Sequence, residues 1–498
     1  MQTNKKFGLL IGATVFVILL LIGDLDPTRP QINTMAAIAV LMAILWITEA
    51  IPLAATSLIP LIFFPFTGIL STEEIASSYI NSIIFLFLGG FLIAIAMEEW
   101  ELHKRIALKI ITIFGGSPTS IILGFMASGA LLSMWISNTA TALMLLPIGM
   151  AVIQKIENEF GQEKTHNFTV NVLLSIAYSC TLGGVATLIG TPPNLVMVKM
   201  VTVLFPGAPE ISFGSWMLLA LPVSILMLCA VAILLTKVLF KVDKDVKLDK
   251  GFIEDEYKQL GKISFEEKTV SIIFMITALL WIFRSDILFG FGTIPGWSNL
   301  LPTAEFINDG TVAITMAFIL YLIPSKSGKR CLLDQKAFNK VPWGIILLFG
   351  GGFALAKGFS STGLSVFIGE QLTGLENISP LFIIIITAFA ITFLTELTSN
   401  TAITQMILPI VASVSIAIGL NPLLLMFTVT LSASMAFMLP VGTPPNTIIF
   451  AGGRIKIFEM AKTGFALNIV GVIIVSLLVY FLGSLIFGLD TFPLWANP

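Results

Sequence analysis

Long apolar segments recur along almost the whole chain, and they restrict the possible folds more than any other feature. A helix that crosses a bilayer needs about 20 mostly apolar residues, and we count about eleven such spans. Charged residues make up only 11% of the 498 residues, too few to cover a soluble surface of this size. We therefore predict an all-α, multi-pass protein of the cytoplasmic membrane.

Basic residues gather in two segments, and they indicate how the chain is oriented in the membrane. Eight lysines lie within 237–268, and five lysines or arginines lie within 326–340. Both segments should be cytoplasmic, whereas 289–310, which has no Lys or Arg, should be external. Lys5 and Lys6 place the N-terminus inside, and we interpret the apolar run 7–22 as a spanning helix instead of a signal peptide.

The chain also repeats itself. Gly89-Gly90-Phe91 recurs as Gly351-Gly352-Phe353, and Ser137-Asn138-Thr139 recurs as Ser399-Asn400-Thr401, both 262 residues later. Gly190-Thr-Pro-Pro-Asn194 recurs 252 residues later as Gly442-Thr-Pro-Pro-Asn446. A polar loop at 154–167, shorter in the second half, would account for the difference. The two repeats are expected to be inverted relative to each other, as in many secondary transporters, or parallel.

These repeats divide the chain into five predicted segments. They are N-terminal scaffold helices (1–76), a first repeat (77–236), a cytoplasmic linker (237–268), scaffold helices and loops (269–340) and a second repeat with the C-terminal helix (341–498). Each repeat contains a hairpin and both polar motifs. Six short runs should interrupt helices: 85–97, 137–139, 190–194, 345–356, 399–401 and 442–446.

The polar motifs lie within apolar spans, where their groups need partners. A Ser-Asn-Thr tripeptide can join neighbouring helices, but two identical copies at equivalent positions favour a shared binding site. Two successive prolines break a helix, which frees amides for an anion and carbonyls for a hard cation; a simple kink is the alternative. Hydroxyls and carboxamides of all four motifs, Asn194 and Asn446 included, would then converge on a small anion.

None of the four motifs contains Lys or Arg, so a dianion would need co-bound cations or a neighbouring lysine such as Lys357. Lys357 would otherwise extend toward water from a hairpin end. Ser133 and Thr395 lie one helical turn before Ser137 and Ser399, where they would supply oxygens to a cation or bond to their own helix.

Two acidic residues lie within apolar stretches. Glu49 and Glu396 are either proton carriers or structural groups, since carboxylates inside a membrane are functional suspects by default. Glu49 would equally cap a broken helix, with Pro52 marking the break.

Together with Trp46-Ile-Thr-Glu-Ala-Ile-Pro52, these motifs resemble the divalent anion/sodium symporter family of di- and tricarboxylate transporters, from about Ala36 to Gly483. The resemblance implies an elevator-type transporter with broken helices, inverted repeats and re-entrant hairpins at Ile83–Ile110 and Trp343–Leu372. It also implies a homodimer, formed through the scaffold within membrane lipid.

The resemblance further implies the site residues. Substrate would contact Ser137, Asn138, Thr139, Thr191, Pro192, Ser399, Asn400, Thr401, Thr443 and Pro444. One sodium ion would lie beside Ser133, Ser137, Asn138 and the Gly190 carbonyl, and a second beside Thr395, Ser399, Asn400 and the Gly442 carbonyl.

The sequence thus favours sodium-coupled import of C4-dicarboxylates such as succinate, fumarate or malate, with no organic cofactor and no nucleic acid. A sodium-independent exchanger, for example of 2-oxoglutarate against succinate or malate, is the alternative, as is a tricarboxylate or sulfate transporter of the same fold. A channel or a membrane-embedded hydrolase has weaker support, because internal repeats suit an occluded site and both histidines, His103 and His166, lie outside the motifs.

Overall fold

The computed structural model describes residues 2–22, 25–242, 250–289, 292–371 and 378–496. Helices account for nearly all of its regular structure, and β1 (Ile287–Phe289) pairs with β2 (Gly292–Ile294) in a small antiparallel hairpin. Among the described residues, nine helices are long and apolar enough to cross a membrane, and five shorter apolar helices accompany them. The predicted all-α, multi-pass architecture is therefore confirmed.

Before the first Ser-Asn-Thr motif the chain forms α1 (Gln2–Ile22), α2 (Pro30–Thr48), α3 (Leu53–Thr56), α4 (Ile59–Thr67), α5 (Thr72–Tyr79), α6 (Ser82–Glu99) and α7 (Leu102–Phe114). The first motif pair lies among α8 (Pro118–Ser133), α9 (Asn138–Phe160), α10 (Gln162–Val185), α11 (Pro192–Leu204) and α12 (Phe213–Ile233). A π-helical turn, η1 (Leu234–Leu239), extends α12.

The middle of the chain forms α13 (Lys250–Gln259), α14 (Phe265–Ile282), the short turns η2 (Trp297–Leu300) and η3 (Ala304–Phe306), α15 (Asp309–Leu322), α16 (Lys336–Lys340), α17 (Trp343–Thr362) and α18 (Leu364–Glu370). The second motif pair lies among α19 (Pro380–Leu394), η5 (Thr395–Leu397), α20 (Asn400–Ala417), α21 (Pro422–Ala433) and α22 (Pro444–Ala451). The chain ends with α23 (Ile457–Leu478), η6 (Val479–Gly483), α24 (Ser484–Phe487) and η7 (Leu494–Ala496).

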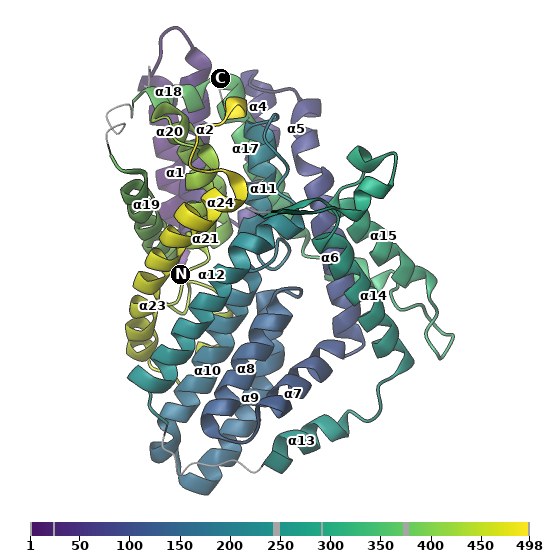
Figure 1. The fold of residues 1–498 in the computed structure, drawn as a ribbon. Coiled ribbons are helices and arrows are strands. Elements are labelled where there is room, and N and C mark those ends of the chain that lie inside the picture. The colour runs from purple at the N-terminus through teal and green to yellow at the C-terminus, as the bar shows by residue number, and fades with distance from the viewer. Residues whose placement is uncertain (1, 23–24, 243–249, 290–291, 372–377, 497–498) are drawn as a thin grey trace.

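The two motif-bearing parts interlock. α11, which follows the first Gly-Thr-Pro-Pro-Asn motif, packs against α20 of the second part, and α22 of the second part packs against α9 of the first. α10 and α21 lie at the centre, and every residue of α21 is buried. In Figure 1, α7 to α10 form the lower part, α6, α14 and α15 lie to the right, and α19 and α23 lie to the left.

Four of the six predicted helix interruptions are confirmed, namely those at 137–139, 190–194, 399–401 and 442–446. The other two predictions are wrong, because α6 and α17 run without a break through their Gly-Gly-Phe runs. The glycines serve close packing instead. A Cβ atom on Gly89 would lie 2.6 Å from the main chain of Ala313 in α15, and one on Gly351 would lie 2.6 Å from the carbonyl oxygen of Ser57.

The two predicted hairpins correspond to α6 with α7 and α17 with α18, each pair joined by a short turn, although Leu372 lies outside the described residues. α18 is only seven residues long. Their re-entrance stays a prediction. The two Ser-Asn-Thr motifs themselves lie in two further helix connections, between α8 and α9 and between α19 and α20.

The predicted polar loop at 154–167 is mostly helical. α9 continues to Phe160 and α10 starts at Gln162, joined by Gly161 in a left-handed conformation with φ 84°. The longer helices carry polar side chains that tie the two halves together. Arg454 Nη1 lies 2.9 and 2.8 Å from the two carboxylate oxygens of Glu157, and His166 Nε2 lies 2.7 Å from Glu459 Oε1.

The close contact of α6 with α15 generates a prediction for Gly89→Ala. The added methyl group would meet the Ala313 main chain, and overpacking of this kind costs about 1–3 kcal/mol. We expect a lower midpoint of thermal unfolding in detergent. Gly344→Ala in α17 is the matched control, because its Cβ would only make ordinary contact, at 3.7 Å, with Ala54. Equal midpoints for the two variants would contradict the packing role.

Candidate functional site

The first Ser-Asn-Thr motif lies at the end of a short break between α8 and α9. Ser137 is extended, with φ −58° and ψ 142°, and its hydroxyl accepts a hydrogen bond from the Ala140 N–H at 3.2 Å. This is an ordinary N-cap, which explains why α9 starts directly after it. Ser137, Asn138 and Thr139 are all half-buried, so their side chains are neither packed away nor fully open.

Oxygen atoms from three separate segments surround the side chain of Asn138. Its Oδ1 lies 2.5 Å from Ser133 Oγ, and the same position lies 3.0 Å from the Cys180 carbonyl oxygen and 3.3 Å from that of Gly190. Turning the amide over would place its N–H groups there instead. In that orientation they donate to the Ser133 hydroxyl and to the Cys180 and Gly190 carbonyls, so Asn138 itself satisfies these oxygens. Ser133, Asn138 and Gly190, predicted as sodium ligands, are thus brought together.

Two glycines make this arrangement possible. A Cβ atom on Gly184 would lie 2.5 Å from Asn138 Oδ1, and one on Gly190 would lie 2.5 Å from the Gly184 carbonyl oxygen. Sequence reasoning missed both Gly184 and the Cys180 carbonyl. The Gly183-Gly184 pair ahead of the proline motif is a signal that could have indicated a close main-chain approach.

The second half forms a related cluster. Thr395 Oγ1 lies 2.7 Å from Asn400 Oδ1 and 2.9 Å from the Ala433 carbonyl oxygen. Thr395 and Asn400 were predicted to share a sodium site, and the structure brings them together. Gly442, predicted for the same site, packs against Glu396. A Cβ atom on Gly442 would lie 3.0 Å from Glu396 Oε2. For Ser399 the role as a cation ligand stays a prediction.

Glu396 holds the main chain where α21 is broken. Its Oε1 accepts hydrogen bonds from the N–H groups of Phe437 and Met438 at 2.7 and 2.8 Å and from Asn468 Nδ2 at 2.8 Å, and its Oε2 accepts one from the Leu439 N–H at 3.0 Å. These four donors occupy both carboxyl oxygens, so the side chain holds this stretch of main chain in place. Of the two interpretations left open, this geometry favours the structural one over a proton carrier.

In the first half, a different side chain holds the main chain at the corresponding break. Met134 stands where Glu396 stands in the second half, and the hydroxyl of Thr187 donates to the Met134 carbonyl while accepting from the Gly190 N–H. A neutral hydroxyl therefore takes the place of a carboxylate. The two breaks are similar in plan, but one is held by a hydroxyl and the other by a carboxyl group.

Asn194 and Asn446 occupy equivalent positions and have equivalent contacts, which correct the expectation that their carboxamides face the anion. Asn194 Nδ2 donates to the carbonyls of Gly184 and Thr187 at 3.1 and 2.6 Å. Asn446 Nδ2 donates to those of Ala436 and Leu439 at 3.2 and 3.1 Å. Both side chains are fully buried. The physical reason is that a broken helix frees carbonyls, which need donors when water is absent.

The threonines and prolines of the same motifs start the half-helices that follow. Thr191 and Thr443 are extended N-caps, and Pro192 and Pro444 occupy the first helical positions. This is where a proline costs least, because its missing N–H would have no partner anyway. The second proline of each motif also lacks an N–H, and the N–H groups of Asn194 and Asn446 already donate to the Thr191 carbonyl and the Thr443 hydroxyl.

The other two candidate residues, Glu49 and Lys357, lie away from the two clusters. Glu49 is exposed at the end of α2 with φ 46°, and Pro52 marks the start of α3, so its interpretation as the end of a broken helix is confirmed. Lys357 Nζ donates to the Glu74 carbonyl at 3.1 Å, which holds the ammonium group at α5.

With this geometry in view, the comparisons with known proteins are decisive. The sequence matches the family described as "Sodium:sulfate symporter transmembrane region" over residues 3–489. The chain belongs to this family. The predicted resemblance to divalent anion/sodium symporters is thereby confirmed.

Similar sequences include the sodium-dependent dicarboxylate transporter SdcS of Staphylococcus saprophyticus, 43% identical over 98% of this chain and 93% of that protein. SdcS of Staphylococcus aureus strain MRSA252 is 42% identical, with the same coverage. These relatives are transporters, which supports a transporter over a membrane hydrolase.

Two solved structures share the fold. They are the Alcanivorax borkumensis YdaH transporter, with TM-score 0.53 and 11% identity over 88% of this chain and 89% of that one, and Neisseria gonorrhoeae MtrF, described as illuminating a class of antimetabolite efflux pumps, with TM-score 0.55 and 12% identity over 90% and 94%. At these identities the likeness concerns the fold alone.

The contacts of Glu396 generate a prediction for Glu396→Gln. Glutamine keeps one acceptor oxygen, but its NH2 group would face at least one of the four donors, so we expect a loss of about 1–3 kcal/mol in unfolding free energy, measured by thermal unfolding in detergent. Glu49→Gln, at an exposed carboxylate, should leave the midpoint unchanged. A Glu396→Gln protein of normal stability whose transport no longer depends on pH would instead support a proton carrier.

Proposed function

We propose that this chain imports small dicarboxylates together with sodium ions across the cytoplasmic membrane. The observation that carries this proposal is that Ser133, Asn138 and the Gly190 carbonyl, three oxygen-bearing groups from separate segments, meet at the first pair of helix breaks. The curated relatives of this chain are sodium-dependent dicarboxylate transporters over its whole length, which supports the same conclusion.

Sodium fits the donor set of both clusters. Hydroxyl, amide and main-chain carbonyl oxygens are the ligands that hard cations prefer, and neither cluster contains sulfur or imidazole among these groups. We assign the first ion to Ser133, Ser137, Asn138 and the Gly190 carbonyl. The second is assigned to Thr395, Ser399, Asn400 and the Gly442 carbonyl, close to the carboxyl group of Glu396.

The substrate would lie between the two Ser-Asn-Thr motifs and the starts of α11 and α22. Its carboxylates would accept hydrogen bonds from hydroxyl, amide and main-chain N–H groups of Ser137, Asn138, Thr139, Thr191, Pro192, Ser399, Asn400, Thr401, Thr443 and Pro444; the prolines would contribute only apolar contact. A C4-dicarboxylate such as succinate, fumarate or malate carries two negative charges, which two sodium ions would balance.

Coupling follows from shared residues. Asn138 and Asn400 each belong to a proposed ion site and to the proposed substrate site, so sodium binding would fix the amide that the substrate meets. Two ligands that favour the same arrangement raise each other's affinity by the same factor. Without the ions, the charge of the dianion would stay unbalanced and the amide would be free to move.

The order of the helices supports inverted repeats. With 237–268 in the cytoplasm, α12 runs inward, so α10 and α11 together run outward, and α8 and α9 enter from and return to the cytoplasmic side. α14, α15 and α17 then cross three times, so α19 and α20 enter from and return to the external side. The reciprocal packing of α11 on α20 and of α22 on α9 is what such a relation produces.

We infer from this order an elevator mechanism, in which α8–α12 and α19–α24 move as one body and carry the site across the membrane. The remaining helices would form the stationary scaffold. Compared with the five segments derived from sequence, this places α6, α7, α17 and α18 with the scaffold. A homodimer through that scaffold belongs to the same proposal, and the exposed apolar side chains of Phe7, Leu10 and Phe66 provide surface for lipid or a second copy.

The first test is sodium dependence. Binding of succinate to the purified protein should tighten as sodium rises, and proteoliposomes should take up succinate with sodium but less with lithium or choline. A panel of fumarate, malate, 2-oxoglutarate, citrate and sulfate then ranks the substrates. Equal succinate affinity with and without sodium would overturn symport and favour the exchanger.

The second test removes one oxygen from each ion site. Ser133→Ala and Thr395→Val should each raise the sodium concentration needed for half-maximal uptake roughly tenfold, because each loses one ligand of an otherwise intact site. Matched controls are Ser128→Ala in α8 and Thr277→Val in α14, whose buried hydroxyls bond to main-chain carbonyls elsewhere. If the controls change sodium dependence as much as the test variants do, the assignment of the sites is wrong.

A further inference from the structure

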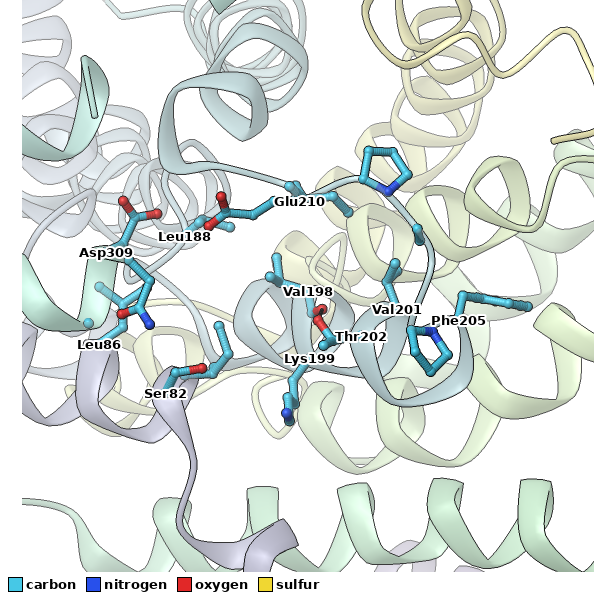
Figure 2. Close-up of a pocket in the computed structure, with 17 residues that line it drawn as sticks. Ser82, Leu86, Leu188, Val198, Lys199, Val201, Thr202, Phe205, Glu210 and Asp309 are labelled. Atoms are coloured by element: carbon cyan, nitrogen blue, oxygen red, sulfur yellow. Dashed lines mark hydrogen bonds between the residues drawn. The ribbon is translucent and has the colours of Figure 1, made fainter. Parts of the chain in front are cut away.

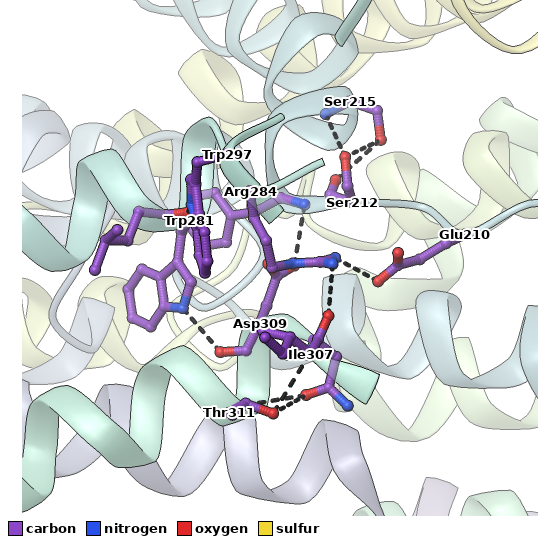
Figure 3. Close-up of polar contacts among 12 residues, drawn as sticks. Glu210, Ser212, Ser215, Trp281, Arg284, Trp297, Ile307, Asp309 and Thr311 are labelled. Carbon is purple, nitrogen blue, oxygen red and sulfur yellow. Dashed lines mark hydrogen bonds and ion pairs between the residues drawn. The ribbon is translucent and has the colours of Figure 1, made fainter. Parts of the chain in front are cut away.

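Arg284, just beyond the end of α14, binds two carboxylates that lie on different parts of the molecule. Its Nε lies 2.5 Å from Asp309 Oδ1 at the start of α15, and its Nη2 lies 2.5 Å from Glu210 Oε1 in the loop before α12. Figure 3 shows this arrangement together with the hydrogen bond from Nη1 to the Ile307 carbonyl at 3.0 Å. A single guanidinium therefore joins the proposed scaffold to the proposed moving body.

Asp309 adds a second link between the same two parts. Its Oδ2 accepts a hydrogen bond from the Phe213 N–H, at the start of α12, at 3.2 Å. Its carbonyl accepts one from the indole N–H of Trp281, in α14, at 3.0 Å. The start of α12 is thus held by a residue that α14 itself keeps in place.

Stacked aromatic rings continue this link toward the substrate site. The ring of Phe213 stacks on that of Trp281, with centroids 5.1 Å apart, and on that of Trp135, 6.0 Å apart. Trp135 also meets Phe274 of α14 edge-on at 5.2 Å. Since Trp135 lies two residues before Ser137, the stack runs from the scaffold to the first Ser-Asn-Thr motif.

Two cavities flank this link. One, of about 260 Å³, lies between α11 and the starts of α6 and α15, and its lining includes Ser82, Lys199, Thr202, Glu210 and Asp309 (Figure 2). The other, of about 600 Å³, is lined by Glu210, Arg284 and Glu305 among others. Both cavities leave the boundary between the parts incompletely filled at this end, so the contacts of Arg284 and Asp309 contribute to holding the two parts together here.

The charges are distributed so that the link can open. Arg284 and Asp309 are 4% and 7% exposed, and both lie on the scaffold side, so they stay paired when the other part leaves. Glu210 is 55% exposed and returns to water at little cost. Burial opposes the charge on Arg284, but Asp309 and Glu210 outweigh burial and raise its pKa, so the guanidinium remains charged. Opening of this link therefore leaves no buried charge without a partner.

We propose that Arg284 and Asp309 form an external latch, which holds Glu210 and Phe213 in the present arrangement and releases them when the binding-site body moves. This inference rests on the proposed elevator motion. The latch sets how long the protein stays in this arrangement. The aromatic stack reaches Trp135, so a change at the first Ser-Asn-Thr motif would alter how long this arrangement lasts.

The test uses Glu210→Gln, which removes one ion pair and leaves Arg284, Asp309 and the four motifs intact. Thr202→Cys, in the wall of the smaller cavity, reports the arrangement in a background with Cys229→Ser and Cys331→Ser. Labelling of this cysteine by an impermeant maleimide from the external side should be roughly two- to fivefold faster in Glu210→Gln, because the opposite wall withdraws when the latch opens. High salt should reduce the difference, since it screens the pair in the unmodified latch.

Glu305→Gln is the matched control. Glu305 is exposed and lines the larger cavity, but it makes no ion pair in the described part of the chain. In this variant the introduced cysteine should be labelled at the original rate. If Glu210→Gln labels no faster than Glu305→Gln, the latch is wrong, whereas sodium-dependent succinate uptake in the same proteoliposomes would still support the proposed function. If uptake by the unmodified protein does not depend on sodium, the proposed function is overturned. The labelling rates decide the latch separately.

Discussion

Every break in a helix within apolar surroundings frees main-chain groups, and the need to give these groups partners organises the whole binding region. Asn194 and Asn446 donate to the carbonyls that the breaks in α10 and α21 release. Thr187 and Glu396 serve the remaining main-chain groups. The breaks are therefore held by buried side chains that bond to the main chain of the breaks themselves.

The two halves satisfy this need with different chemistry, and the difference bears on transport. Thr187 is neutral, whereas Glu396 is a carboxylate that is 3% exposed and directed at main-chain N–H groups. A cation beside Gly442 would therefore lie near a carboxyl group that the first site lacks. Two ions of the same kind would then bind with different affinities at sites that the repeats make similar in shape.

The sequence was sufficient for the features that local chemistry dictates. Paired prolines break helices in any context, and the repeat of Ser137–Thr139 at 399–401 identified the two clusters before any coordinates. It failed where tertiary contact decides. Gly89 looked like a helix break but is a contact point for α15, and Asn194 looked like a ligand but turns back onto its own loop.

Arg284 was missed for a related reason, although the sequence contains a signal for it. An arginine at the external end of an apolar span opposes the positive-inside rule, so it needs a local reason to be there. Its partners come from residues 74 positions before it and 25 positions after it, a pairing that no local pattern reveals.

The same electrostatic reasoning applies to the ion sites and to the latch. A substrate with two negative charges crosses an apolar barrier only if opposite charge travels with it, and in the proposed mechanism the motifs provide oxygens for sodium instead of a fixed lysine. The latch meets the complementary condition, because the charge that stays behind, Arg284, keeps Asp309, and the charge that leaves, Glu210, returns to water. Neither movement exposes an unpaired charge to a low-dielectric interior, so a body that carries its own counter-ions can slide past a scaffold that keeps its own.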